Sequence, residues 1–178
     1  MTASLPITAL STPNESQIVA SAKEGDKHAF KQLYELHHRH MYALCLRLCG
    51  DSQLAEEALQ DAFVRAWQKL SLFDGKSQFG TWLHRLTVNQ ALSTLKKHRS
   101  FWARFIPIEE QFEPLSKEIQ HENLDKLLLR LPERTRIVFV LFSIEGYQHD
   151  EIAKLLNIAV GTSKAQYHRA KALLQELI

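Results

Sequence analysis

The feature that most constrains this chain is a helix–break–helix pattern in residues 147–178. The break at 157–159 is as short as a helix-turn-helix requires, although the usual turn glycine is absent. A longer helix is predicted from about Val160. The first helix has apolar residues at the spacing of one buried face: Ile152, Ala153, Leu155 and Leu156. A segment with this pattern must bury its apolar face against further helices.

The second helix of this motif has the polar groups that a DNA-binding helix needs. Residues 152–175 contain four Lys or Arg and no acid. Cations bind phosphates, and amide and guanidinium groups read base edges in the major groove. We expect Ala165, Ala172 and Leu173 to pack inward. A helical pair with an ordinary solvated basic face is the alternative. The residues expected to face outward are Thr162, Lys164, Gln166, His168, Arg169 and Lys171.

Charge is segregated along the chain, although the net charge is only +2. Residues 75–108 contain six Lys or Arg and no acid, whereas residues 109–125 contain six acids and one Lys. This asymmetry predicts a nucleic-acid-facing element followed by an acidic connector. The 178 residues, of which 45% are hydrophobic and 24% charged, are typical of one or two soluble globular domains.

The sequence predicts neither a membrane span nor secretion. It has no apolar run of about eighteen residues, the length that a membrane-spanning helix needs. A signal peptide begins with a positively charged segment, but no Lys or Arg precedes Lys23. The only cysteines, Cys45 and Cys49, lie four residues apart on one helical face and are poorly placed for a disulfide. We therefore expect a reduced, cytoplasmic protein without membrane insertion.

Helix start and stop signals divide the first part of the chain into three helices. Residues 1–14 are rich in Ser, Thr and Pro and are expected to form a flexible N-terminus. A short helix over about 16–23 should end at Gly25, and Asp26 should cap a second helix that runs to about Cys49 and stops at Gly50. Asp51 or Ser52 should cap a third helix that ends near Leu70.

The third helix is predicted to have two different faces. Phe63 and Trp67 form an aromatic pair at i, i+4 spacing, beside polar residues such as Gln60, Asp61 and Arg65. By composition, this side is either the solvated side of a bundle helix or a partner-binding surface. The core face is predicted to contain Leu54, Ala55, Ala58, Leu59, Ala62 and Ala66.

A loop at 71–78 and a long helix at 79–99 follow. The helix combines aromatic, amide and basic side chains with no carboxylate, a mixture that binds single-stranded or opened nucleic acid by stacking and phosphate contacts. The alternative is that Phe79 and Trp82 belong to the core, and for Trp82 the core is the better interpretation. The residues in this mixture are Phe79, Trp82, Asn89, Lys96, Lys97, His98 and Arg99.

The helical spacing of apolar residues is lost over residues 100–123, which contain several acids and two prolines. This composition predicts an interdomain linker. A second compact unit, 124–178, then begins with a short helix at 124–130. Pro132 should occupy the first turn of a helix over 133–146, because its missing N–H would be unpaired there anyway. The predicted fold is all-α: two small helical domains, 15–99 and 124–178, joined by an acidic linker.

The ordered motifs resemble the extracytoplasmic-function (ECF) sigma factors, the small promoter-recognition subunits of bacterial RNA polymerase. The resemblance spans about Gly25 to Leu177. In the first domain it rests on GDKHAFKQLYELH, LAEEALQDAFVRAWQKL and FDGKSQFGTWLHRLTVNQA. In the second it rests on LPERTRIVFVLFSIEGYQHDEIAKLL and AVGTSKAQYHRAK. It implies a sigma region 2 helical bundle, a region 4 helix-turn-helix, and no covalent chemistry or cofactor of the chain's own.

The resemblance also implies a role for each surface. One side of the third helix, with Gln60, Asp61, Phe63, Arg65 and Trp67, would bind core RNA polymerase at its clamp. The acidic linker would enter the polymerase, which contributes its beta and beta-prime subunits, and an anti-sigma factor, often membrane-anchored, would hold the chain inactive. The −35 duplex would contact Thr162, Lys164, Gln166, His168, Arg169 and Lys171. The −10 element would be captured and opened, with a flipped base, by Lys76, Ser77, Phe79, Trp82, Asn89, Lys96, Lys97 and Arg99.

Departures from the family pattern fall among base- and phosphate-contacting positions. Ser93 stands where an Asp is usual, and Lys96 and Lys97 replace arginines, which keeps the charge but not the bidentate fork. The promoter sequence therefore cannot be transferred from relatives. The remaining departures are Gln148 at a usual Ser cap, and Ser163, Gln166 and Tyr167 in the recognition helix.

Two alternatives compete with this interpretation. A zinc site of His37, Cys45 and Cys49 is chemically conceivable, but surface histidines beside two small buried thiols fit the pattern better, and we expect no metal. A stand-alone helix-turn-helix regulator is the other alternative, in which the first domain would sense a ligand or dimerise. That domain lacks the sequence of a ligand pocket or dimer seam, and nothing in the chain indicates an enzyme.

Overall fold

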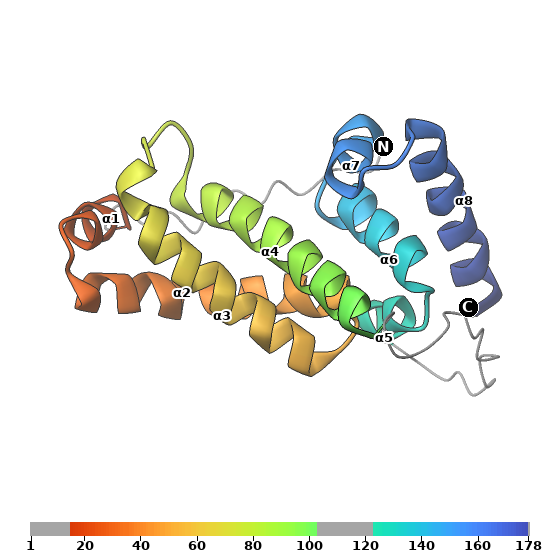
Figure 1. Cartoon of the computed structure of the whole chain (residues 1–178), viewed down its shortest axis with the longest axis horizontal. Coiled ribbons are helices and arrows are strands. Elements are labelled where there is room, and N and C mark those ends of the chain that lie inside the picture. The colour runs from red at the N-terminus through yellow and green to blue at the C-terminus, as the bar shows by residue number, and fades with distance from the viewer. Residues whose placement is uncertain (1–14, 103–122, 178) are drawn as a thin grey trace.

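The computed structural model describes residues 15–102 and 123–177, which form helices joined by short turns. The first domain contains α1 (Glu15–Lys23), α2 (Lys27–Cys49), α3 (Ser52–Lys69), the short 3-10 turn η1 (Leu70–Leu72) and α4 (Phe79–Trp102). In Figure 1, α2, α3 and α4 form an elongated bundle with α1 packed across one end. The predicted N-terminal segment 1–14 and most of the predicted linker lie outside the described residues.

Local signals in the sequence set the helix ends of the first domain. The Asp26 carboxylate accepts hydrogen bonds from the N–H groups of His28 and Ala29, at 2.8 and 3.2 Å, and so caps α2. Gly50 ends α2 in the left-handed conformation, with φ of +73°. Asp51 then caps α3 by accepting from the N–H of Leu54 at 2.9 Å. These boundaries agree with the prediction to within one residue.

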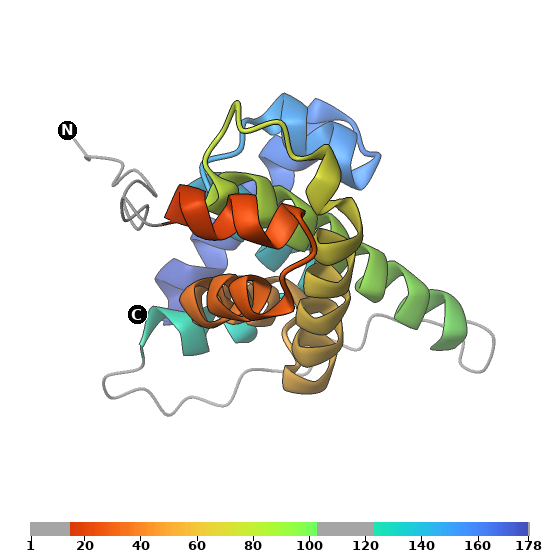
Figure 2. The same ribbon diagram turned by 90° about the vertical axis from the view of Figure 1, so that its left-hand side faces the viewer.

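The second domain contains α5 (Leu124–Leu129), α6 (Glu133–Phe139), the π-helical turn η2 (Val140–Ile144), α7 (His149–Leu156) and α8 (Val160–Leu177). Helices α7 and α8 form the predicted helix-turn-helix. Asn157 replaces the missing turn glycine by adopting φ of +53°, a conformation that Asn tolerates better than most residues. Figure 2 shows the second domain beside α2 and α4 of the first.

Three expectations for the second domain were wrong in detail. Pro132 lies just before α6, at its N-cap, and not in its first turn. The helix predicted over 133–146 changes to a π-helical turn at Val140, where the N–H of Glu145 donates to the carbonyl of Val140 at 3.0 Å. Ala165 and Ala172, which were expected to pack inward, are exposed, whereas Leu173 is half-buried and packs against the core as expected. The buried residues of α8 are Ser163, Ala170, Leu174 and Leu177.

The face of α8 was misassigned because alanines occur on both sides of the helix and the inward side carries a serine. Ser163 is fully buried, and its hydroxyl pairs with Nδ1 of His149 at 2.9 Å. A buried hydroxyl with a partner is tolerated in a core. The helix is therefore rotated relative to the predicted packing.

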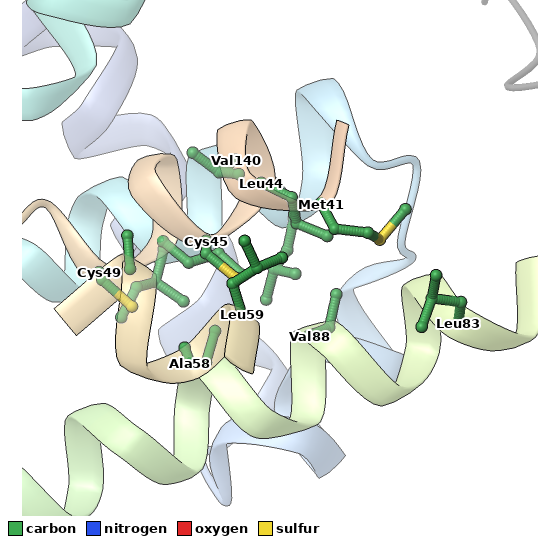
Figure 3. Close-up of a cluster of buried hydrophobic side chains, with 14 of the residues drawn as sticks. Met41, Leu44, Cys45, Cys49, Ala58, Leu59, Leu83, Val88 and Val140 are labelled. Carbon is green, nitrogen blue, oxygen red and sulfur yellow. The ribbon is translucent and has the colours of Figure 1, made fainter. Parts of the chain in front are cut away.

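One apolar core runs through both domains. In Figure 3, Leu44 and Cys45 of α2 lie with Leu59 of α3 and Val88 of α4, and Val140 of the second domain joins them. On α3, Ala55, Ala58, Leu59, Ala62 and Ala66 are buried as predicted, while Leu54 is half-buried. Small alanines let α3 approach its neighbours closely, which accounts for the tight packing of α2, α3 and α4.

Candidate nucleic-acid and polymerase interfaces

A cavity lies between α1 and the loop that leads into α4. Its volume is about 520 Å³, and it is lined by Glu15, Val19 and Lys23 of α1 and by residues 73–79 of the loop. Nζ of Lys23 donates to the carbonyl of Phe73 at 2.7 Å and holds the start of the loop against α1. The predicted −10 residues Lys76 and Ser77 are exposed at this cavity. The sequence did not indicate that α1 forms its second wall.

The turn of the loop is fixed by its own polar groups. The Asp74 carboxylate accepts from the backbone N–H of Lys76 at 3.1 Å and pairs with its Nζ at 3.2 Å. These contacts, the backbone hydrogen bond first, lower the pKa of the exposed Asp74 carboxyl. Gly75 adopts φ of +74°, which a side chain would strain.

The aromatic residues near the loop belong mostly to the core. Phe79 is only 3% exposed, and its ring centroid lies 5.9 Å from that of Phe73 and 5.7 Å from that of Trp82. Trp82 is half-buried, as its core alternative anticipated. In this conformation Phe79 supports the loop from beneath and offers no open face on which a base could stack.

Helix α4 carries the amide and the three cations of the predicted −10 surface. Asn89 is exposed, and its Nδ2 donates to the carbonyl of Arg85 at 2.9 Å. Lys96 is also exposed. Lys97 pairs with Glu57 of α3 at 3.1 Å, and Arg99 pairs with Glu133 of the second domain. This surface is continuous with the loop at the N-terminal end of α4.

On α3 the predicted polymerase-binding residues divide between surface and core. Gln60 and Arg65 are exposed, Trp67 is half-buried, and Asp61 accepts from Nε2 of Gln90 at 3.1 Å. Phe63 is buried, with Phe30 and Tyr34 of α2 against its ring.

Sequence reasoning missed the α2 side of this surface. The Phe30 ring packs on Trp67 with centroids 5.0 Å apart, and Tyr34 and Val64 are 39% and 54% exposed. Exposed apolar and aromatic side chains that lie together are more typical of a protein-binding surface than of a solvated face. The alternation of exposed apolar with charged residues on α2 could have indicated the surface.

On α8, five of the six predicted −35 residues are exposed: Thr162, Lys164, His168, Arg169 and Lys171. Gln166 is half-buried and accepts a hydrogen bond from Oγ1 of Thr135 at 2.7 Å. Tyr167 packs on Phe142, and Nζ of Lys171 lies 5.7 Å from the centre of the Tyr167 ring. Desolvation, with Lys164 and His168 nearby, lowers the pKa of His149, the first residue of α7, which contacts Ser163 of α8.

The residues of the zinc alternative do not converge. His37 contacts the carboxylate of Glu15, with Nε2 and Oε1 2.5 Å apart. Burial raises the pKa of Cys45 and of Cys49 to about 12, so both thiols are protonated at neutral pH. Within residues 15–102 and 123–177 no three potential ligand residues are grouped for a metal ion. None of the helices in that part of the chain is both long and apolar enough to cross a membrane.

Comparison with known families agrees with this two-domain geometry. The family model described as Sigma-70 region 2 matches residues 33–101, and Sigma-70, region 4 matches residues 121–174. The chain is 30% identical over 168 residues to the ECF RNA polymerase sigma factor SigM of Mycobacterium tuberculosis, covering 93% of this chain and 85% of that protein. The chain belongs to the ECF sigma factors of the sigma-70 family. It is thus a non-enzymatic alternative sigma factor that directs RNA polymerase to initiate transcription, and the stand-alone regulator is set aside.

Other relatives of this sigma factor support the same family. It is 28% identical to SigW of Bacillus subtilis, covering 89% of this chain and 93% of that one, and 29% identical to the sigma-E factor of Escherichia coli, with 90% and 92% covered. Among solved structures it resembles RpoE in complex with the anti-sigma factor NepR from Bartonella quintana. That match has a TM-score of 0.56 at 26% identity and covers 83% of this chain and 95% of the other. CnrH in complex with the cytosolic domain of CnrY gives 0.51 at 27% identity, with 92% and 96% covered.

Proposed function

We propose that three surfaces divide the work of this sigma factor. The loop 73–79 and the outward side of α4 capture the −10 element, the exposed side of α8 binds the −35 duplex, and the aromatic surface of α2 and α3 binds core polymerase. The division into domains at 15–99 and 124–178 is part of this proposal. The observation that carries it is the cavity beside the loop, which adjoins the acid-free helix α4 with its amide and basic groups.

The cavity supports the proposal because its size and polarity suit a flipped base. About 520 Å³ is enough for one nucleobase, and the lining offers the Lys76 ammonium and the Ser77 hydroxyl. Unstacking a base costs a few kcal/mol, roughly what a pocket and its hydrogen bonds can return. Lys96, Lys97 and Arg99 would hold the phosphates downstream, as non-specific electrostatic contacts do. Asn89 is the amide placed to read a base edge.

Phe79 and Phe63 take supporting roles in this proposal. Both were expected at ligand surfaces, and both are buried in the described structure. Phe79 would shape the loop and Phe63 would shape the polymerase surface from beneath, while Tyr34, Val64, Arg65 and Trp67 make the contacts. On α8, Gln166 contributes to −35 binding only after it exchanges its bond to Thr135 for one to DNA.

The proposed partners are the beta and beta-prime subunits of core polymerase, promoter DNA and an anti-sigma factor. The last is suggested by two solved relatives, RpoE in complex with the anti-sigma factor NepR and CnrH in complex with the cytosolic domain of CnrY. We place the active protein in the cytoplasm, at the nucleoid. Co-purification of a partner that is lost on substitution of the α2–α3 surface, and that blocks polymerase binding when added back, would identify the anti-sigma factor.

The test of the −10 assignment is the reactivity of unpaired thymines toward permanganate in complexes of polymerase, sigma factor and promoter. Asn89→Ala and Lys76→Ala should leave polymerase binding intact and reduce opening about tenfold, whereas Lys126→Ala on α5 should change neither. Normal opening by both site variants would overturn the assignment of the loop and α4.

A further inference from the structure

The buried residues of α8 fix the direction in which its other residues face. Ser163 and Ala170 are fully buried, and Leu174 is 7% exposed. At about 100° per residue, Ala170 and Leu174 each lie within about 20° of Ser163 around the helix axis. Ala165 is exposed and lies about 200° from Ser163. It therefore points away from the core of the second domain, at whose outer edge Figure 1 shows α8.

Two hydrogen bonds hold α8 in this rotation. The Ser163 hydroxyl pairs with Nδ1 of His149 on α7 at 2.9 Å. On the other flank, Oγ1 of Thr135 on α6 donates to Oε1 of Gln166 at 2.7 Å. Thr135 is 1% exposed, so its hydroxyl needs an acceptor within the domain. The amide of Gln166, which is the kind of group that binds an adenine edge, is therefore held at the inner flank of the helix.

This rotation leaves a methyl group at the centre of the outer side. Lys164 is exposed about 100° to one side of Ala165, and Thr162 is exposed about 60° to the other. Residues near the N-terminus of a recognition helix contact the base edges, and all three positions lie in the first two turns of α8. The longer flanking side chains can reach phosphates, whereas the short Ala165 lets the helix backbone approach the bases.

The chemistry of the major groove limits what Ala165 can recognise. Every base edge there offers hydrogen-bond donors or acceptors, and thymine alone adds an apolar group, its C5-methyl. Alanine can neither donate nor accept through its side chain. A polar base edge placed against it would lose water without gaining a hydrogen bond, which is unfavourable. Contact between two methyl groups removes apolar surface from water and is favourable.

We infer that Ala165 is a specificity-determining residue of the −35 contact and that it selects a thymine by packing against the C5-methyl group. The inference rests on the proposed function, in which the exposed side of α8 binds the −35 duplex. It assigns the reading of one base pair to a residue that the sequence pattern had placed in the core. Gln166 reads no base as long as Thr135 holds its amide.

The test removes single methyl groups from the DNA. Core polymerase with the full-length chain binds a promoter selected from a pool with a randomised −35 element. Each −35 thymine, on either strand, is then replaced in turn by deoxyuridine, which lacks the C5-methyl and keeps the hydrogen-bonding groups. Competition binding should show a loss of about fourfold at one thymine, the effect of one buried methyl group.

Two alanine variants connect this loss to Ala165. With Ala165→Gly, the thymine and deoxyuridine duplexes should bind equally well. Ala172→Gly is the matched control: it removes an exposed methyl about two turns further along α8 and has the same cost in helix propensity. This control should keep the fourfold difference. Because each protein is compared on two duplexes, any loss of helix stability cancels. Absence of a sensitive thymine, or an undiminished difference with Ala165→Gly, would overturn the inference.

A selection experiment tests the bond that holds Gln166. Thr135→Val removes the donor and keeps the shape, so the freed amide should add a preference for adenine beside the thymine. Thr135→Ser retains the hydroxyl and should select the wild-type sequence. An unchanged selection with Thr135→Val would overturn the role given to this bond. Failure of the −35 assignment itself would appear differently, as undiminished −35 binding by Lys164→Ala.

Discussion

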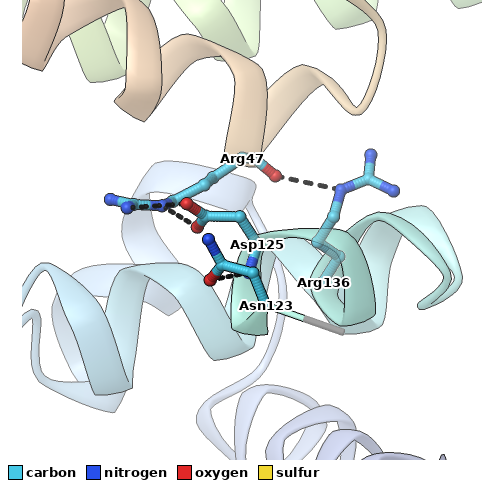
Figure 4. Close-up of polar contacts among 4 residues, drawn as sticks. All are labelled: Arg47, Asn123, Asp125 and Arg136. Carbon is cyan, nitrogen blue, oxygen red and sulfur yellow. Dashed lines mark hydrogen bonds and ion pairs between the residues drawn. The ribbon is translucent and has the colours of Figure 1, made fainter. Parts of the chain in front are cut away.

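Arg136 of α6 caps the C-terminal end of α2, because its guanidinium donates to the carbonyls of Arg47, Leu48 and Cys49 (Figure 4). Gly50 offers a sensitive test of this cap. A Cβ at this position would lie 2.4 Å from Nη2 of Arg136 and 2.6 Å from its Cζ, and the backbone φ of +73° is strained for any side chain. Gly75 has nearly the same φ, +74°, but nothing within 4 Å of its Cβ position. The two glycines therefore share the backbone penalty and differ in the arginine alone.

The magnitudes follow from these contacts. An alanine in the left-handed region costs about 1–2 kcal/mol, which is the whole effect expected for Gly75→Ala. Gly50→Ala must also displace the guanidinium. The displacement of a flexible side chain is sterically cheap, but it breaks hydrogen bonds of a charged donor worth about 1.5–3 kcal/mol. The expected loss for Gly50→Ala is thus about 3–5 kcal/mol.

The assay is urea unfolding followed by circular dichroism, with each alanine also placed in an Arg136→Met background. There the cost of Gly50→Ala should fall to about 1–2 kcal/mol, because the clashing group is gone. Equal losses for Gly50→Ala and Gly75→Ala, or a Gly50 cost that survives in the Met background, would refute the account of the cap.

Three further predictions address the core, the thiols and the recognition helix. Thr94 is buried with no hydrogen-bond partner for its hydroxyl, whereas the buried Thr87 hydroxyl donates to the carbonyl of Leu83 at 2.9 Å. Thr94→Val should therefore raise the free energy of unfolding by about 1 kcal/mol, and Thr87→Val should not. Thermal unfolding measures both. Burial raises the pKa of Cys45 and of Cys49 to about 12, so on a rise in pH the unfolded chain loses these protons first. The free energy of unfolding should therefore fall as pH rises from about 9 toward 12. Cys49→Ala should make this dependence on pH less steep, and an unchanged dependence would contradict the burial argument. Lys164→Ala should weaken binding of all −35 sequences alike and reduce the magnitude of the salt slope of affinity by about 1, whereas loss at particular base pairs only would indicate a base contact.

The parts of this fold that local chemistry dictates could be predicted from the sequence. Asp26, Gly50 and Asp51 each act through neighbours two to four residues away, and each ends or begins a helix where the pattern indicated. The α7–α8 break was equally local, with Asn157 supplying the left-handed turn. The face of α8 was not predictable, because alanines gave it two apolar sides and the inward Ser163 depends on His149 from another helix.

The parts that depend on distant residues were missed. Arg136 and the carbonyls it caps are 87–89 residues apart, and no periodicity relates them. The same holds for the wall that α1 contributes to the loop cavity, since Lys23 and Phe73 are fifty residues apart. Phe79 and Phe63 were assigned to surfaces by their type, but aromatic rings serve cores and interfaces equally well. The predicted linker began at residue 100, but α4 continues to Trp102. The rest of the linker up to residue 122 lies outside the described residues and stays a prediction.

The most direct test of the central account is to map transcription start sites with core polymerase and this sigma factor on a pool of randomised promoters. The account predicts that starts appear only with the sigma factor. Lys164→Ala should weaken the use of every −35 sequence and leave the −10 preference unchanged, whereas Asn89→Ala should change the preferred sequence only at −10. If either substitution altered both elements, or if neither altered any, the division of promoter binding between α8 and the loop with α4 would be contradicted.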